Sequence, residues 1–131
     1  MQANTHEHAT IRDRAFIGGR AQVRDFAVVS GKADVADNAQ ISGTAEVRDI
    51  AVVRGNARVS GNARVTEKSI ISGNAEVSGN AIIGGDARVF GNARISGTAK
   101  IWGGEWDGSE GWVTSGDWLS PHEPVYSGFG P

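Results

Sequence analysis

One feature constrains this chain more than any other, namely a six-residue period that runs without interruption from Ala9 to Gly104. These residues divide into sixteen consecutive hexads. The first residue of every hexad is Ala, except at Ser69, and the third is always Ile or Val. The fifth residue is Gly, Asp or Glu throughout. Such regularity predicts a repeat architecture in which each unit packs mainly on its neighbours.

Each hexad has the composition of one short strand followed by one corner. Side chains alternate along an extended segment, so positions one and three face the same side and position two faces the opposite side. The small Ala and the branched Ile or Val therefore face inward. Positions five and six are rich in Gly, Asp and Asn, which tolerate a positive φ and form tight turns. A helix would need apolar residues to recur near every 3.6 positions, and a period of six does not supply this.

The unit SGNARV at 60–65 resembles the hexapeptide repeat of left-handed parallel β-helix proteins. The resemblance covers residues 9–104. It implies an all-β, three-sided solenoid with three hexads, and thus 18 residues, in each turn. Sixteen hexads would then give about 5.3 coils and a length of about 25 Å, because coils stack ~4.8 Å apart.

Residues that are 18 apart in the sequence should stack if each turn contains three hexads. Two columns of identical polar residues follow this spacing: Asn38, Asn56, Asn74 and Asn92, and then Ser42, Ser60, Ser78 and Ser96. Identical polar side chains can form hydrogen-bonded ladders along such a stack. This favours three-sided coils over the alternative that any six-residue repeat produces coincidences at 18.

The three predicted faces differ in chemistry. One face presents Gln22, Gln40, Arg58, Glu76 and Arg94 outward and is predicted to be solvated. The other two faces carry outward apolar residues, and the corner between them holds Ile50: the set is Phe16, Val28, Ile50, Val52, Ile70, Ile82 and Phe90, together with Trp102. Apolar patches of this kind mark interfaces. The resemblance also implies homotrimers of parallel prisms, so we predict a homotrimer whose contacts flank Ile50, with a monomer as the alternative.

Basic residues gather near the same corner, on it or on the adjacent face. The candidate ligand-binding residues are Arg12, Arg14, Lys32, Arg48, Arg54 and Lys68. Convergent Arg and Lys in a cleft between subunits would bind a carboxylate, a phosphate or a nucleotide. Asp13, Asp49 and Glu67 interleave with these bases. The alternative is therefore a solvated surface with local ion pairs, each worth little.

The repeat is flanked by an N-terminal segment, residues 1–8, and by an acidic, Trp-rich tail, residues 105–131. The tail contains no Lys or Arg, and its aromatic residues are Trp106, Trp112, Trp118, Tyr126 and Phe129. Continuing the period would turn Asp107 inward, which argues against another regular coil. We expect irregular strands that cap the C-terminal edge. The alternative is an aromatic patch that binds a sugar or a base.

The best-known proteins with this repeat are acyltransferases that use acyl-CoA, and the resemblance implies a catalytic His in a coil and an inserted loop. This chain has no His between residues 9 and 121 and no interrupted hexad. Related γ-type carbonic anhydrases bind zinc through three His, but here His6 and His8 precede the first coil and His122 follows the last. We therefore predict no catalytic residue, no metal and no cofactor.

The net charge, the lengths of the apolar runs and the Cys content exclude or disfavour further classes of partner. The formal net charge of −2 argues against a nucleic-acid partner. No apolar run approaches the ~20 residues needed to span a bilayer, and the lack of Cys is compatible with a cytoplasmic location. The repeat also resembles those of bacterial and phage proteins. The sequence thus predicts a non-catalytic, homotrimeric binding protein that holds a small anion such as a nucleotide or phosphate. The alternatives are a purely structural or protein-interaction solenoid and an acyltransferase-like enzyme.

Overall fold

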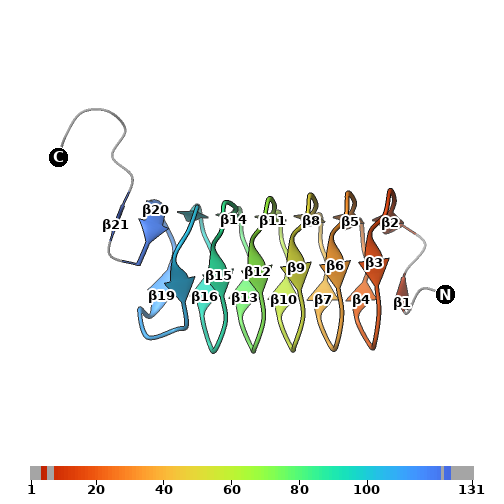
Figure 1. The fold of residues 1–131 in the computed structure, drawn as a ribbon, viewed down its shortest axis with the longest axis horizontal. Coiled ribbons are helices and arrows are strands. Elements are labelled where there is room, and N and C mark those ends of the chain that lie inside the picture. The colour runs from red at the N-terminus through yellow and green to blue at the C-terminus, as the bar shows by residue number, and fades with distance from the viewer. Residues whose placement is uncertain (1–3, 6–7, 122, 125–131) are drawn as a thin grey trace.

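The computed structural model describes residues 4–5, 8–121 and 123–124. These residues form a three-sided parallel β-solenoid of about six turns, with strands and no helix in the described part (Figure 1). Each complete turn contributes one two-residue strand to each of three sheets. The structure confirms the predicted three-sided parallel solenoid.

The three sheets are named A, B and C. Sheet A contains β1 (Asn4–Thr5), β4 (Gln22–Val23), β7 (Gln40–Ile41), β10 (Arg58–Val59), β13 (Glu76–Val77), β16 (Arg94–Ile95) and β19 (Trp112–Val113). Sheet B contains β2 (Thr10–Ile11), β5 (Val28–Val29), β8 (Glu46–Val47), β11 (Arg64–Val65), β14 (Ile82–Ile83), β17 (Lys100–Ile101), β20 (Asp117–Ser120) and β21 (Glu123–Pro124). Sheet C contains β3 (Phe16–Ile17), β6 (Asp34–Val35), β9 (Val52–Val53), β12 (Ile70–Ile71), β15 (Arg88–Val89) and β18 (Glu105–Trp106).

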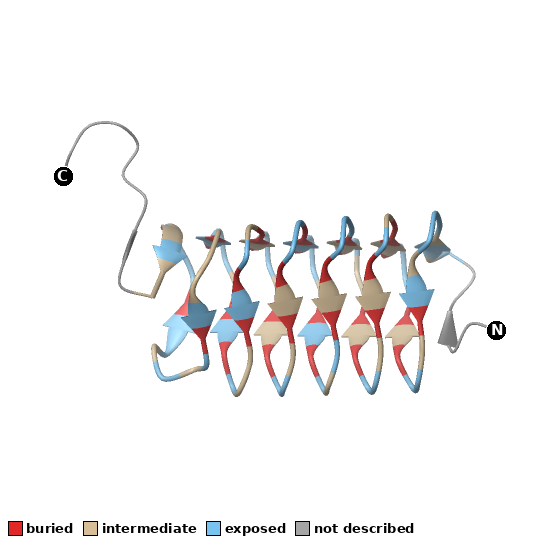
Figure 2. Cartoon of the chain, viewed as in Figure 1, coloured by how far each residue is buried: buried red, intermediate tan, exposed pale blue. Residues whose placement is uncertain are grey.

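Successive turns pair in an 18-residue register, as in Arg58 opposite Glu76 and Val59 opposite Val77. Backbone hydrogen bonds join one turn to the next, for example from Arg58 N to Ala75 O at 3.0 Å. The Ala at position one and the Val or Ile at position three are buried in nearly every hexad, whereas position two is exposed or half-buried (Figure 2). The inward and outward assignment from the sequence is thereby confirmed.

Ser69 begins the one hexad of the sixteen that does not start with Ala, and the Ser69 side chain is fully buried. Its Oγ donates a hydrogen bond to the Thr66 carbonyl at 2.7 Å. A buried hydroxyl with such a partner avoids the desolvation cost of an unpaired polar group. The core therefore accepts Ser at this position.

Acidic residues take the place of Gly at five corners. Asp13, Asp25, Asp37, Asp49 and Glu67 all have φ between 59° and 61°. Each carboxylate accepts a hydrogen bond from the backbone N–H of the residue 18 positions later, as between Asp25 Oδ2 and Gly43 N at 2.9 Å. These acids therefore satisfy the backbone of the next turn, which offsets the cost of the left-handed conformation.

Asp107 does not face inward, because the strict six-residue period does not continue past Gly104. In sheet C, Val89 pairs with Trp106, a separation of 17 residues where the repeat has 18. The corner after β17 is one residue shorter than the corners before it, so Trp106 turns inward and is only 1% exposed. Asp107 lies exposed in the following turn. It accepts hydrogen bonds from Ser109 N at 3.0 Å and Ser109 Oγ at 2.7 Å, which lower the pKa of the Asp107 carboxyl.

Indole rings cover the C-terminal end of the core. Trp106 and Trp118 meet edge to face, with ring centroids 5.9 Å apart. Trp106 Nε1 donates to Gly103 O at 2.8 Å, and Trp118 Nε1 donates to Ser115 O at 2.9 Å. The antiparallel strand β21 pairs with β20 and closes sheet B. The expected capping tail thus begins as one more turn of the solenoid, while Tyr126 and Phe129 lie outside the described residues.

Strand pairing also extends beyond the other end of the predicted repeat, because β1 pairs in parallel with β4. The sixteen hexads of the sequence correspond to β2 through β17. The additional strands at both ends account for about six turns in the structure, compared with the 5.3 coils expected from the hexads alone.

Replacing Asp25 should test two properties of a corner acid, namely its hydrogen bond to the next turn and its tolerance of the left-handed backbone. In Asp25→Ala the hydrogen bond from Gly43 N is lost, whereas residue 25 still has to adopt the unfavourable left-handed conformation with a Cβ atom. The free energy of unfolding should therefore fall by about 1–2 kcal/mol. Asp25→Asn retains an acceptor and tolerates this conformation, and should lose less than about 0.5 kcal/mol. Urea denaturation of the three proteins measures the difference. Equal stability of the Ala and Asn variants would contradict the assigned role.

Trp106 and Trp112 offer a matched test of the capping arrangement. Trp106→Ala would leave a large cavity at the end of the core, and should reduce the free energy of unfolding by ~3–5 kcal/mol. Trp112 is 63% exposed, so Trp112→Ala should change it by no more than about 0.5 kcal/mol. Thermal and urea denaturation check both values, and similar losses in the two variants would show that the cap is assigned wrongly.

Candidate functional site

The B–C corner is the series of turns that link sheet B to sheet C, at residues 12–14, 30–32, 48–50, 66–68, 84–86 and 102–104. Five of the predicted basic residues lie on it: Arg12, Arg14, Lys32, Arg48 and Lys68. Arg54 follows β9 and lies on the corner between sheets C and A, so the structure does not bring it to the other five.

The five bases of the B–C corner do not face the same sheet. Arg12 and Arg48 directly follow strands of sheet B, whereas Arg14, Lys32 and Lys68 lie at the other end of their turns, beside sheet C. All five are exposed. One turn of the solenoid advances ~4.8 Å, so the bases form two lines along the axis.

None of the six predicted basic side chains makes an ion pair or a side-chain hydrogen bond with another residue of the described ranges. Arg88 and Glu105 on sheet C form an ion pair, with an N–O distance of 3.9 Å. The nearby acids bond to the backbone instead. Asp49 Oδ2 accepts from Glu67 N at 2.9 Å, and the Glu67 carboxylate accepts from Gly85 N. The bases therefore stay available to a ligand.

A groove of about 330 Å³ lies beside this corner, over sheet B. It is lined by Arg48, Asp49, Arg64, Thr66, Glu67, Ile82 and Trp102. The polar residues lie on the earlier turns, whereas Ile82 and Trp102 supply an apolar wall on the later ones. The groove thus combines guanidinium donors with an indole ring.

Gly84 is buried and has no room for a side chain. A Cβ atom at Gly84 would lie 2.8 Å from Glu67 Oε1, 3.0 Å from the Trp102 ring and 3.1 Å from Thr66 Oγ1. Thr66, Glu67 and Trp102, which all line the groove, therefore lie too close to Gly84 to accept a side chain there.

Arg64 was not among the predicted binding residues, although it lines the groove together with Arg48. It lies on β11, at the outward position between Glu46 and Ile82. The 18-residue spacing would have placed Arg64 beside the corner, but the prediction considered charges on the corner and on sheet C only. Its guanidinium lines the groove although the sequence pattern did not single it out.

The predicted interface residues lie on the two faces that meet at the B–C corner. Phe16 is 59% exposed and Ile50 47% exposed. The other five are half-buried, with Val52 and Ile70 adjacent on sheet C, Val28 and Ile82 on sheet B, and Phe90 on the corner after β15. Sheet A presents no comparable row of outward aliphatic residues in its described side chains.

Sheet C also carries a carboxylate in an unusual environment. Asp34 lies between Phe16 and Val52 in the outward row. One of its carboxylate oxygens is buried and has no hydrogen-bond partner among the described residues. Such a group is costly unless a cation or donor approaches it.

Within residues 4–5, 8–121 and 123–124, no group of three or more His, Asp or Glu side chains is arranged to hold a metal ion. His8 stacks on Phe26, with ring centroids 5.1 Å apart. His6 and His122 lie outside the described residues. The same described part has no helix of the length and apolarity that crossing a membrane requires.

The model of the YdcK beta solenoid repeat family matches residues 57–73. This stretch contains β10, β11 and β12, which form one strand in each of the three sheets and so one complete turn. The chain is a β-solenoid repeat protein. Its similarity to the YdcK repeat covers this turn, and no curated protein and no solved structure matches the chain.

Proposed function

We propose that this solenoid is a non-catalytic binding protein that holds a small anionic ligand, such as a nucleotide or a phosphate, at the B–C corner. We further propose that it forms a homotrimer in which neighbouring subunits complete the clefts. The observation that carries the proposal is the division of charges at this corner. The acids are engaged by backbone N–H groups, whereas the bases have no partner in the described residues.

The groove favours a ligand with one anionic end and one flat apolar part. Arg48 and Arg64 supply planar, multi-donor guanidinium groups that suit a phosphate. Trp102 and Ile82 supply a surface on which a base can pack. Asp49 and Glu67 line the same groove and repel additional negative charge. This arrangement supports a nucleoside monophosphate over a triphosphate.

The apolar residues on sheets B and C support association with a second copy of the same chain. Burying each such side chain is worth roughly 1.5–3 kcal/mol. Contact between sheet B of one subunit and sheet C of the next would be heterologous, and three such contacts can close a ring. Sheet C presents the Asp34 carboxylate and sheet B is flanked by the bases Arg12 and Arg48, so sheet B of a second copy can offer a cation to Asp34. This charge complementarity agrees with a partner of identical sequence.

Sedimentation equilibrium at micromolar concentration should give about three times the chain mass of 13.7 kDa. Ile70→Asp would place a charge in the proposed contact and should yield monomers. Phe26 is 62% exposed but lies on the corner between sheets A and B, so Phe26→Asp should leave the trimer intact. A wild-type monomer, or equal effects of the two variants, would refute the proposed assembly.

Adenosine monophosphate is the first probe for the groove. At 100 times its dissociation constant it should stabilise the protein by ~2.7 kcal/mol, measured as a thermal shift. Arg64→Gln and Gly84→Ala, whose added Cβ would displace the groove-lining side chains of Glu67, Thr66 and Trp102, should both abolish the shift. Arg24→Gln, an exposed Arg on the corner between sheets A and B, is the matched control and should retain it. No shift with adenosine monophosphate, adenosine triphosphate or inorganic phosphate would favour a purely structural or protein-interaction solenoid.

A further inference from the structure

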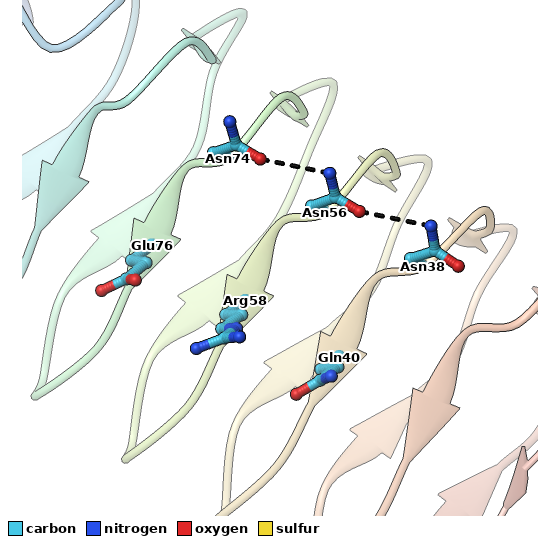
Figure 3. A pocket seen from close by; sticks show the side chains of 6 residues that line it. All are labelled: Asn38, Gln40, Asn56, Arg58, Asn74 and Glu76. Carbon is cyan, nitrogen blue, oxygen red and sulfur yellow. Dashed lines mark hydrogen bonds between the residues drawn. The ribbon is translucent and has the colours of Figure 1, made fainter.

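Sheet A and the corner between sheets C and A carry a polar strip that runs along the solenoid axis, on a different face from the proposed anion site. Two rows of side chains lie side by side on it, with one residue of each row on each turn (Figure 3). One row contains Asn38, Asn56 and Asn74, and the other contains Gln40, Arg58 and Glu76. Together they line a hollow of about 390 Å³.

The Asn row forms a hydrogen-bonded ladder. Asn38 Nδ2 donates to Asn56 Oδ1 at 3.3 Å, and Asn56 Nδ2 donates to Asn74 Oδ1 at 3.2 Å. An amide has two N–H donors and two acceptor lone pairs, so the ladder leaves the middle amide one of each for another partner. The ladder also fixes the amides at the ~4.8 Å spacing of the turns, which reduces the entropy lost on binding. The strip is therefore a preorganised row of donors and acceptors.

Both rows continue toward the C-terminal end into a second hollow, of about 150 Å³. Asn92 is the next residue of the Asn row, and Arg94 and then Trp112 follow Glu76 in register on sheet A. The guanidinium carbon of Arg94 lies 4.7 Å from the centroid of a Trp112 ring. Trp112 is nevertheless 63% exposed. The polar strip thus leads to an indole that Arg94 holds in place and that remains open to a ligand.

The chemistry of the strip excludes several classes of ligand. Glu76 lies between Arg58 and Arg94 in the outward row, so a polyanion would meet a carboxylate midway along it. A peptide cannot add here as a strand, because the backbone groups of these strands already bond to the neighbouring turns. The lining is too polar for a lipid chain, since Trp112 is its one large apolar side chain among the described lining residues.

A linear, neutral oligosaccharide is a ligand class that these exclusions leave and that matches the groups lining the strip. Its hydroxyl groups both donate and accept hydrogen bonds, as amide, guanidinium and carboxylate groups require. The apolar face of a sugar ring packs on an exposed indole. Its repeating units also match a binding surface that repeats from turn to turn. We propose that the polar strip from Asn38 to Trp112 binds a neutral linear oligosaccharide. A sugar ring stacks on the Trp112 indole, and the amides of the Asn ladder form hydrogen bonds with the sugar hydroxyl groups.

The test titrates ¹⁵N-labelled full-length protein with four neutral hexasaccharides: cellohexaose, chitohexaose, maltohexaose and laminarihexaose. With at least one of them, the Nε1–H signal of Trp112 and the side-chain amide signals of Asn56 and Asn74 should shift along one common titration curve. The Nε1–H signal of Trp102, which lines the groove over sheet B, should not move. This internal reference separates the sugar strip from the anion site, so either proposal can fail without the other.

Variants localise the binding. Trp112→Ala should weaken the sugar affinity by about tenfold or more, equivalent to about 1.4 kcal/mol. Asn56→Ala should also weaken it, because the middle rung of the ladder is lost. The matched control is Asn62→Ala, since Asn62 donates to Asn80 Oδ1 at 3.1 Å in a similar ladder on the corner between sheets A and B and does not line the hollow. Asn62→Ala should bind like the wild type.

Three results would overturn the proposal. The first is the absence of any shift with all four hexasaccharides at millimolar concentration. The second is sugar binding that Trp112→Ala leaves unchanged. The third is binding of a single-stranded oligonucleotide at the same signals without any sugar binding, because a polyanion would then be the ligand of the strip.

Discussion

The stacking of turns in an 18-residue register is the constraint on which the rest of this structure depends. Nearly all strands have only two residues, which is far too short for a stable isolated sheet. Their backbone groups are satisfied by the turns before and after, and the buried Ala and Val or Ile of each hexad fill the narrow interior. Position one must remain small and position three must remain branched and apolar. This requirement explains why the repeat is so regular.

The register turns sequence separation into surface columns. Residues 18 apart become neighbours, and each column can carry its own chemistry because the core does not restrict the outward position. One column is an Asn ladder, others contain carboxylates that bond to the next backbone, and the rows on sheet C contain apolar residues. Where outward residues of different chemistry adjoin, as beside the B–C corner, one groove is lined by Arg48, Arg64, Ile82 and Trp102. The fold therefore constrains the inward residues, whereas the outward columns determine what the surface can bind. This agrees with the general independence of fold and function.

The C-terminal end shows what happens when no further regular turn follows. A corner that is one residue shorter changes the register with the preceding turn from 18 to 17 and brings Trp106 inward in place of Asp107. The large indole covers more of the open end than Ala or Val would, and Trp118 packs against it. A strict continuation of the period mispredicts this region, because a local deletion reverses which residue faces the core.

The sequence by itself determined the three-sided solenoid, the inward residues and the Asn ladder, because alternation and an 18-residue spacing are properties of the chain alone. It also placed five of the six candidate bases on one corner. Only the tertiary structure decided that Asp49 and Glu67 bond to backbone N–H groups, and that Arg64 joins Arg48 in a groove with Thr66 and Trp102. The reason is physical. The direction of an outward side chain depends on the donors, acceptors and space that adjacent turns offer, and no single hexad contains that information.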